Sequence, residues 1–187
     1  MGLNYFKMKY LKIPMSRVGV LIGQNGETKK ELETRLDIEL DINSREGEVV
    51  IKEKEETDPL NKIKAQNIVK AIGRGFSPEK ALRLMKDDSD FFVFDLREYV
   101  KKKGKHLRRL KGRVIGKQGK TKNILEQLTG SYISVFGHTI SVISDIENMN
   151  IMKKSIDMLL TGSKQATVYK FVEREMKELR LQKRYDL

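Results

Sequence analysis

Apolar positions along this chain of 187 residues follow two different periods, and the same succession of periods occurs in each half. Ile38, Leu40 and Ile42 alternate with polar residues, which is typical of a half-buried strand. The residues after Asp58 instead carry an apolar side chain at every third or fourth position, which is typical of a helix. The pattern therefore predicts short strands and helices that each bury one face.

Turn and capping signals divide each half into elements. Ser16 is a candidate helix N-cap, and Pro59 a candidate first helical residue. The first half is predicted to contain a strand over 8–13, helices over 16–22 and 27–36, strands over 38–42 and 49–54, a helix over 59–72 and a short helix from 78. The second half is predicted to contain a strand over 91–96, helices over 105–115 and 121–128, strands over 131–136 and 139–144, a helix over 146–160 and an additional helix over about 164–183. The acidic and polar stretch 87–90 is the predicted boundary.

A segment of the chain is duplicated. Gly19–Glu33 aligns without a gap on Gly112–Glu126, at an offset of 93 residues. The identical positions of the first copy are Gly19, Ile22, Gly23, Gly26, Thr28, Lys29, Leu32 and Glu33. The match continues into the strands that follow. A repeat of this length predicts two domains, which we place at residues 1–88 and 89–187.

Each copy contains a G-x-x-G, at Gly23–Gly26 and at Gly116–Gly119, between two predicted helices. Glycines have no Cβ, so the backbone of such a loop can approach a phosphodiester chain closely. The helix that begins at the loop presents free N–H groups to an anion. Beside the second loop, we expect a groove floored by Val114, Ile115, Ile133 and Val135 that holds unstacked bases.

The charge of the chain favours a polyanion as partner. The formal net charge is +12 and the pI is about 9.7. Between Tyr99 and Glu126 there is no acidic residue, whereas the cationic residues of this interval are Lys101, Lys102, Lys103, Lys105, Arg108, Arg109, Lys111, Arg113, Lys117, Lys120 and Lys122. A basic block around a phosphate-approaching loop indicates a polyanion, but charge alone does not separate nucleic acid from an anionic membrane.

Other features narrow the class of protein. The chain has no Cys, which excludes disulfides and thiolate metal sites, and no stretch has the length of a membrane span. The N-terminal residues contain no signal-peptide core, so we expect a cytoplasmic protein without a membrane partner. Gly119-Lys120-Thr121 imitates the end of a P-loop, but Val114 stands where that motif requires glycine. We therefore expect no ATPase, no other enzyme activity and no cofactor.

Both halves resemble type I KH domains, on the signatures Ile22–Gly26 and Ile115–Gly119. The resemblance implies an α+β fold of two tandem domains with the order β-α-α-β-β-α, each a three-stranded sheet packed on helices, followed by a C-terminal helix. The full chain is also similar to the archaeal and eukaryotic two-KH ribosome-assembly factors of the "partner of Nob" type. That similarity rests on the stretches 73–78, 108–122 and 128–135.

The family resemblance implies specific partners. It implies binding of single-stranded small-subunit ribosomal RNA near its 3′ end and assistance in its maturation. It also implies partnership with the Nob endonuclease and, for archaeal members, with the alpha subunit of translation initiation factor two. The alternatives are a KH protein of RNA degradation or messenger-RNA binding, and a protein-interaction scaffold whose loops are relics.

The candidate RNA-binding residues lie around both loops. Those of the second half are Arg108, Arg109, Gly112, Arg113, Val114, Ile115, Gly116, Lys117, Gln118, Gly119, Lys120, Lys122, Ile133 and Val135. Those of the first half are Gly19, Ile22, Gly23, Gln24, Asn25, Gly26 and Lys29. Because only the second loop carries lysines, we predict that the second domain contributes most of the affinity and that the first is a weaker RNA site or an interaction surface.

Overall fold

The computed structural model describes residues 10–54, 58–100 and 104–185 and divides into two compact units, Met1–Met85 and Lys86–Leu187. The predicted domain limits differ from this division by residues 86–88. Part of the predicted strand over 8–13 and the lysines at 101–103 lie outside the described residues. None of the described helices is long and apolar enough to cross a membrane.

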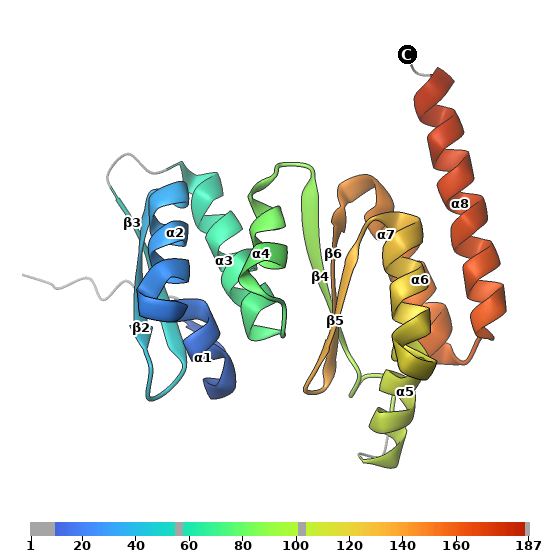
Figure 1. Ribbon diagram of the computed structural model, residues 1–187, viewed down its shortest axis with the longest axis horizontal. Coiled ribbons are helices and arrows are strands. Elements are labelled where there is room, and N and C mark those ends of the chain that lie inside the picture. Colours follow the sequence, from blue (N-terminus) through green and yellow to red (C-terminus); the bar gives the residue numbers. More distant parts are fainter. Residues whose placement is uncertain (1–9, 55–57, 101–103, 186–187) are drawn as a thin grey trace, which may run out of the picture. The chain divides into compact units, whose positions relative to one another are not determined.

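The first unit contains a three-stranded antiparallel sheet with the order β1-β3-β2 (Figure 1). Its elements are β1 (Leu11–Lys12), α1 (Met15–Ile22), the 3-10 turn η1 (Gln24–Gly26), α2 (Glu27–Leu36), β2 (Ile38–Asn43), β3 (Glu48–Glu53), α3 (Pro59–Gly73), α4 (Pro78–Ala81) and the 3-10 turn η2 (Leu82–Met85). Leu40 pairs with Ile51 across the sheet, and both side chains are buried. At the start of α3, the Asp58 carboxylate accepts a hydrogen bond from the Leu60 N–H at 2.9 Å, which makes Asp58 the N-cap.

The second unit repeats this order and adds a helix. Its elements are β4 (Ser89–Asp95), α5 (Lys105–Ile115), the 3-10 turn η3 (Lys117–Gly119), α6 (Lys120–Thr129), β5 (Tyr132–Phe136), β6 (Thr139–Asp145), α7 (Ile146–Thr161) and α8 (Gln165–Tyr185). The sheet has the order β4-β6-β5, again with β5 as an edge strand. Helix α8 packs on α6 and α7 through Val168, Val172 and Met176, which are buried in the core of this unit (Figure 1).

Three local predictions are wrong. The strand expected over 8–13 is limited to Leu11–Lys12 in the described residues, since Tyr10 and Ile13 lie outside β1. Helix α1 begins at Met15, and Pro14 rather than Ser16 occupies the N-cap position, where its restricted φ suits the extended backbone (φ −58°, ψ 139°). Strand β4 begins at Ser89 instead of residue 91, since Ser89 pairs with Asp145 of β6. Backbone pairing therefore extends the strand into the polar stretch that was expected to form the boundary.

Candidate nucleic-acid interface

The two G-x-x-G loops have nearly the same backbone conformation. Gly23 has φ 77° and ψ 174°, and Gly116 has φ 75° and ψ 175°. Gly26 and Gly119 are left-handed, with φ 80° and 79°, and each is followed directly by the first residue of the next helix. The residue before the second glycine is also left-handed in both loops, namely Asn25 and Gln118. The duplicated sequence therefore builds the same helix–loop–helix twice.

The first glycine of each loop is required by space as well as by φ. A Cβ at Gly116 would lie 2.2 Å from Thr121 Oγ1 and 2.7 Å from the Thr121 backbone nitrogen. At Gly23, the corresponding distance to Thr28 Oγ1 is 2.4 Å. The loop thus closes directly on the first turn of the next helix.

Glycines on the helix before each loop have open space around them. No atom lies within 4 Å of a Cβ built at Gly19 or at Gly112, and both residues are exposed. These glycines are therefore not needed for packing inside the unit. They leave a bare stretch of helix beside the loop, which a ligand backbone can approach.

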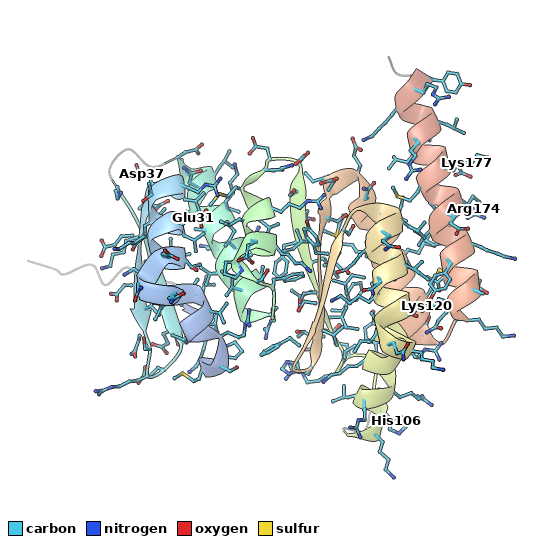
Figure 2. All side chains as sticks on the ribbon, viewed as in Figure 1. Glu31, Asp37, His106, Lys120, Arg174 and Lys177 are labelled. Atoms are coloured by element: carbon cyan, nitrogen blue, oxygen red, sulfur yellow. The ribbon has the colours of Figure 1, made fainter. Side chains whose placement is uncertain are left out.

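The charges of the two elements differ strongly. From Lys105 to Thr129, eight Lys and Arg residues stand against one Glu, a formal charge of +7. From Met15 to Leu36, four Lys and Arg stand against three Glu, a formal charge of +1. Figure 2 shows Lys120 at the start of α6 in the second element and Glu31 on α2 in the first. The same backbone thus carries a cationic loop in one unit and a nearly neutral one in the other.

The expected groove floor is only partly open to a ligand. Val114 and Ile133 are 0% and 2% exposed and belong to the core of the second unit. Ile115 and Val135 are half-buried and reach the surface. Val114 and Ile133 therefore belong to the packed interior, and of the four expected residues only Ile115 and Val135 are accessible for contact with a ligand.

Arg113 has a structural role that the sequence did not indicate. Its Nε donates to the Leu159 carbonyl at 2.6 Å, and a terminal nitrogen donates to the Ser163 carbonyl at 2.7 Å. In the first unit, Arg17 similarly donates to the carbonyls of Ile72 and Phe76 at 2.8 and 2.5 Å, and burial lowers the pKa of its guanidinium. A guanidinium bound to carbonyls near a helix C-terminus anchors that helix. Arg113 is thus an anchor between α5 and α7 and not an open phosphate ligand.

Helix α8 contacts the second loop through polar side chains, which the sequence did not indicate. The Tyr169 hydroxyl donates to Thr121 Oγ1 at 2.9 Å, and Thr121, which is 1% exposed, lies against Gly116. Gln165 Nε2 donates to the Arg113 carbonyl at 3.3 Å. Helix α8 therefore supports the helices on both sides of the loop. The amphipathic pattern predicted the helix but contained no signal for these polar contacts.

Replacing Tyr169 by Phe removes the hydroxyl and keeps the ring. We expect the free energy of unfolding to fall by about 1 kcal/mol, as for one partly buried hydrogen bond. Chemical denaturation measures this change. Thr121→Ser, which keeps a hydroxyl for Tyr169, is the matched control. An unchanged stability of Tyr169→Phe would show that the contact contributes nothing.

A shallow depression of about 490 Å³ lies beside the second loop. It is lined by Lys117, Gln118, Lys120, Asn123, Ile124 and Gln127. The last three were not among the predicted site residues. Their spacing from Lys120 places them on the same face of α6, so helical periodicity alone could have found them.

Comparisons with known proteins agree with this geometry. A family model described as the eukaryotic-type KH domain (KH-domain type I) matches residues 90–177. A KH domain-containing protein of Methanocaldococcus jannaschii is 43% identical over 173 residues, which are 92% of this chain and 76% of that protein. The pre-rRNA-processing protein PNO1 of Saccharomyces cerevisiae is 27% identical over 136 residues, and the match covers 72% of this chain but only 50% of the yeast protein.

Comparison with solved structures also gives a similarity to this group of proteins. A chain in the crystal structure of an a/eIF2alpha–aDim2p–rRNA complex from Pyrococcus horikoshii matches with a TM-score of 0.85 and 42% identity. The match covers 91% of this chain and 94% of that chain. The mixed α+β arrangement of sheets and helices is therefore of the KH type.

Proposed function

This chain belongs to the family of KH proteins that includes PNO1 and the archaeal Dim2 proteins, and on that premise we propose that it is an RNA-binding factor in ribosomal RNA maturation. The observation that carries the proposal is the second helix–loop–helix, where a phosphate-approaching glycine loop lies within an element of formal charge +7. A loop of this kind clamps the backbone of a single strand in KH modules.

The two units are both type I KH domains in this proposal, with limits at residues 1–88 and 89–187 and with α8 as an extension of the second. Their shared element order and the near identity of the loop dihedral angles support this interpretation. The chain acts by binding and positioning RNA, without catalysis.

The proposed RNA contacts are assigned from the solvent exposure of the residues around each loop. Lys117, Lys120, Arg108 and Arg109 are exposed and bind phosphates, while the helix backbone at Gly112, which has open space beside it, and the loop backbone of Gly116–Gly119 lie against the strand. Half-buried Ile115 and Val135 contact bases. In the first unit, Gly19 and the loop Ile22–Gly26 form a second site of lower affinity. Lys29 and Lys122 are each within 4 Å of a glutamate and contribute less.

The proposed RNA is single-stranded small-subunit ribosomal RNA near its 3′ end. The crystal structure from Pyrococcus horikoshii contains a similar chain together with a/eIF2alpha and rRNA, which supports RNA and the alpha subunit of initiation factor two as partners. Partnership with the Nob endonuclease and a cytoplasmic location stay predictions from the family resemblance.

The salt dependence of RNA binding tests the proposal. About four phosphate contacts to a single strand predict a slope near −3 in a plot of log K against log salt, or a loss of affinity of about 60-fold between 50 and 200 mM salt. Fluorescence anisotropy with a labelled RNA of ten nucleotides measures it. No binding at 50 mM salt would favour the scaffold alternative. Competition by a fragment of the ribosomal 3′ end, against a scrambled fragment of equal composition, separates ribosomal RNA from messenger RNA.

A further inference from the structure

Helix α8 follows the duplicated elements and carries a row of cations on its exposed side. From Gln165 to Tyr185 the helix has six Lys and Arg against three Glu, a formal charge of +3. Lys170, Lys177 and Arg184 are spaced seven residues apart, which is about two helical turns, so they lie on one stripe of the helix. These three residues form the α8 row, which spans about 21 Å at a rise of roughly 1.5 Å per residue.

The α8 row is not neutralised by the glutamates of its own helix. Within the part of the chain that the structure describes, no carboxylate oxygen lies within 4.0 Å of a cationic nitrogen of the row. Glu175 and Glu178 instead pair with Arg174, at nitrogen–oxygen distances of 2.7 and 3.9 Å. All three side chains of the row are exposed. Unpaired cations at regular spacing favour an extended anionic ligand.

The opposite side of α8 fixes the row relative to the second loop. Val168, Val172 and Met176 belong to the core of the second unit. The Tyr169 hydroxyl, one residue before the row begins, donates to Thr121 at the start of α6. Figure 2 shows Arg174 and Lys177 on α8 and Lys120 at the start of α6. The row therefore begins next to the helix that follows the loop and continues along a helix packed on the same core.

The last turns of α8 extend beyond the part that packs. Every side chain from Arg180 to Tyr185 is exposed. Lys183 pairs with Glu147 at the start of α7, whereas Arg180 and Arg184 have no carboxylate partner among the described residues. These turns therefore add cationic surface and not apolar burial.

The row lacks the features with which proteins hold unpaired bases. Single strands are held by glycine loops and by aromatic rings on which bases stack. Between Lys170 and Arg184 the one aromatic residue is Phe171, which is half-buried and has Lys154 and Arg174 over its ring, at 5.1 and 5.9 Å from the centroid. Double-stranded RNA is instead recognised by its shape, through phosphates and 2′-hydroxyl groups. A rigid row of cations suits this second kind of ligand.

We propose that the α8 row binds the phosphates of a double-stranded RNA stem that adjoins the single strand held by the second loop. The ammonium and guanidinium groups donate to phosphate oxygens of the stem, while the loop clamps the unpaired strand beside it. The preferred ligand is thus a junction between paired and unpaired RNA. The inference rests on the proposed RNA-binding function and adds a second contact to it.

The test compares a labelled RNA hairpin that carries a single-stranded tail of ten nucleotides with the tail alone. A stem of about twelve base pairs is longer than the row, at roughly 3 Å of axis per base pair. Hairpins with the tail at the 5′ end and at the 3′ end are both measured by anisotropy at 50 mM salt. We expect the unchanged chain to bind the better hairpin about thirtyfold more tightly than the tail. Three further phosphate contacts should steepen the slope of log K against log salt by about 3.

Replacing Lys170, Lys177 and Arg184 together by Gln removes the charge of the row. Because these side chains are exposed, we expect an unchanged melting temperature. The affinity for the hairpin should fall to within about threefold of that for the tail, while the affinity for the tail changes by less than about twofold. The matched control replaces three exposed lysines outside α8 by Gln, which changes the net charge equally and should leave both affinities within about twofold. These lysines are Lys12, Lys70 and Lys86.

Three results would overturn the inference. A hairpin that binds the unchanged chain no better than the tail would leave the row without a stem to bind. An equal loss for hairpin and tail would assign the row to the single strand, and an equal loss in the control variant would show an effect of net charge alone. Binding of the tail alone, with any of these results, leaves the proposed function intact. If the unchanged chain binds neither RNA, the proposed function fails as well, which distinguishes the two failures.

Discussion

Replacing Lys117 and Gln118 together by Asp is expected to lower the affinity for single-stranded RNA by about a hundredfold. The change removes one cation and adds two anions at the exposed tip of a loop in the element of charge +7. A change of three unit charges close to phosphates, at about 1 kcal/mol each, corresponds to about 3 kcal/mol. Anisotropy with a decamer at 50 mM salt measures the loss.

The matched variant is Gln24→Asp with Asn25→Asp in the first loop, for which we expect less than a fivefold loss. That loop lies in an element of charge +1 and has almost the same dihedral angles. Position 25 and position 118 are both left-handed, a conformation that Asp tolerates, so both variants should keep their melting temperatures. If the first-loop variant abolishes binding and the second-loop variant does not, the ranking of the two units is wrong.

Local signals in the sequence predicted the parts of the fold that depend on neighbouring residues. The bounds of α2, Glu27–Leu36, and of α5, Lys105–Ile115, agree with the prediction because a glycine loop adjoins each helix and the apolar spacing is regular. The bounds of β4 do not agree, since a strand ends where its partner strand stops pairing. The polarity of Ser89 and Asp90 contains no information about that partner.

The candidate site shows the same limit. A basic block predicts that its cations face a polyanion, but it cannot show which of them bind the protein itself. Arg113 donates to carbonyls 46 and 50 residues further along the chain, and the Tyr169 hydroxyl reaches back 48 residues to Thr121. Such polar contacts have no periodicity. Duplication provides a partial remedy, because a polar residue kept in both copies, such as Glu126 and Glu33, points to a shared contact, here with an N–H of the following strand.

The two units share one loop conformation but differ in charge, and the proposed function assigns them different affinities for RNA. The glycines and the left-handed residues determine the loop shape, which is the same in both units. The surrounding side chains determine the charge, which is not the same. In the proposed function, this difference in charge makes the second unit the stronger RNA site and the first unit the weaker one.

Replacing Gly116 by Ala is expected to lower the free energy of unfolding by about 3 kcal/mol or more. Its φ of 75° with ψ of 175° is a conformation open essentially to glycine alone, and the added Cβ would overlap Thr121, which is buried and bonded to Tyr169. Gly119→Ala is the matched control in the same loop. It is also left-handed, but the nearest atom to its Cβ is Asn123 Nδ2 at 3.9 Å, so we expect a cost of only about 1 kcal/mol.

Chemical denaturation of both variants measures the difference in stability. For each kcal/mol of stability lost, the RNA affinity measured in parallel should fall more for Gly119→Ala than for Gly116→Ala. The Gly119 Cβ points into open space where the strand is proposed to lie, whereas the Gly116 Cβ points into the protein. Equal destabilisation by the two substitutions would contradict the close packing of Gly116 on Thr121, and with it the view that α6 holds this loop in its binding shape.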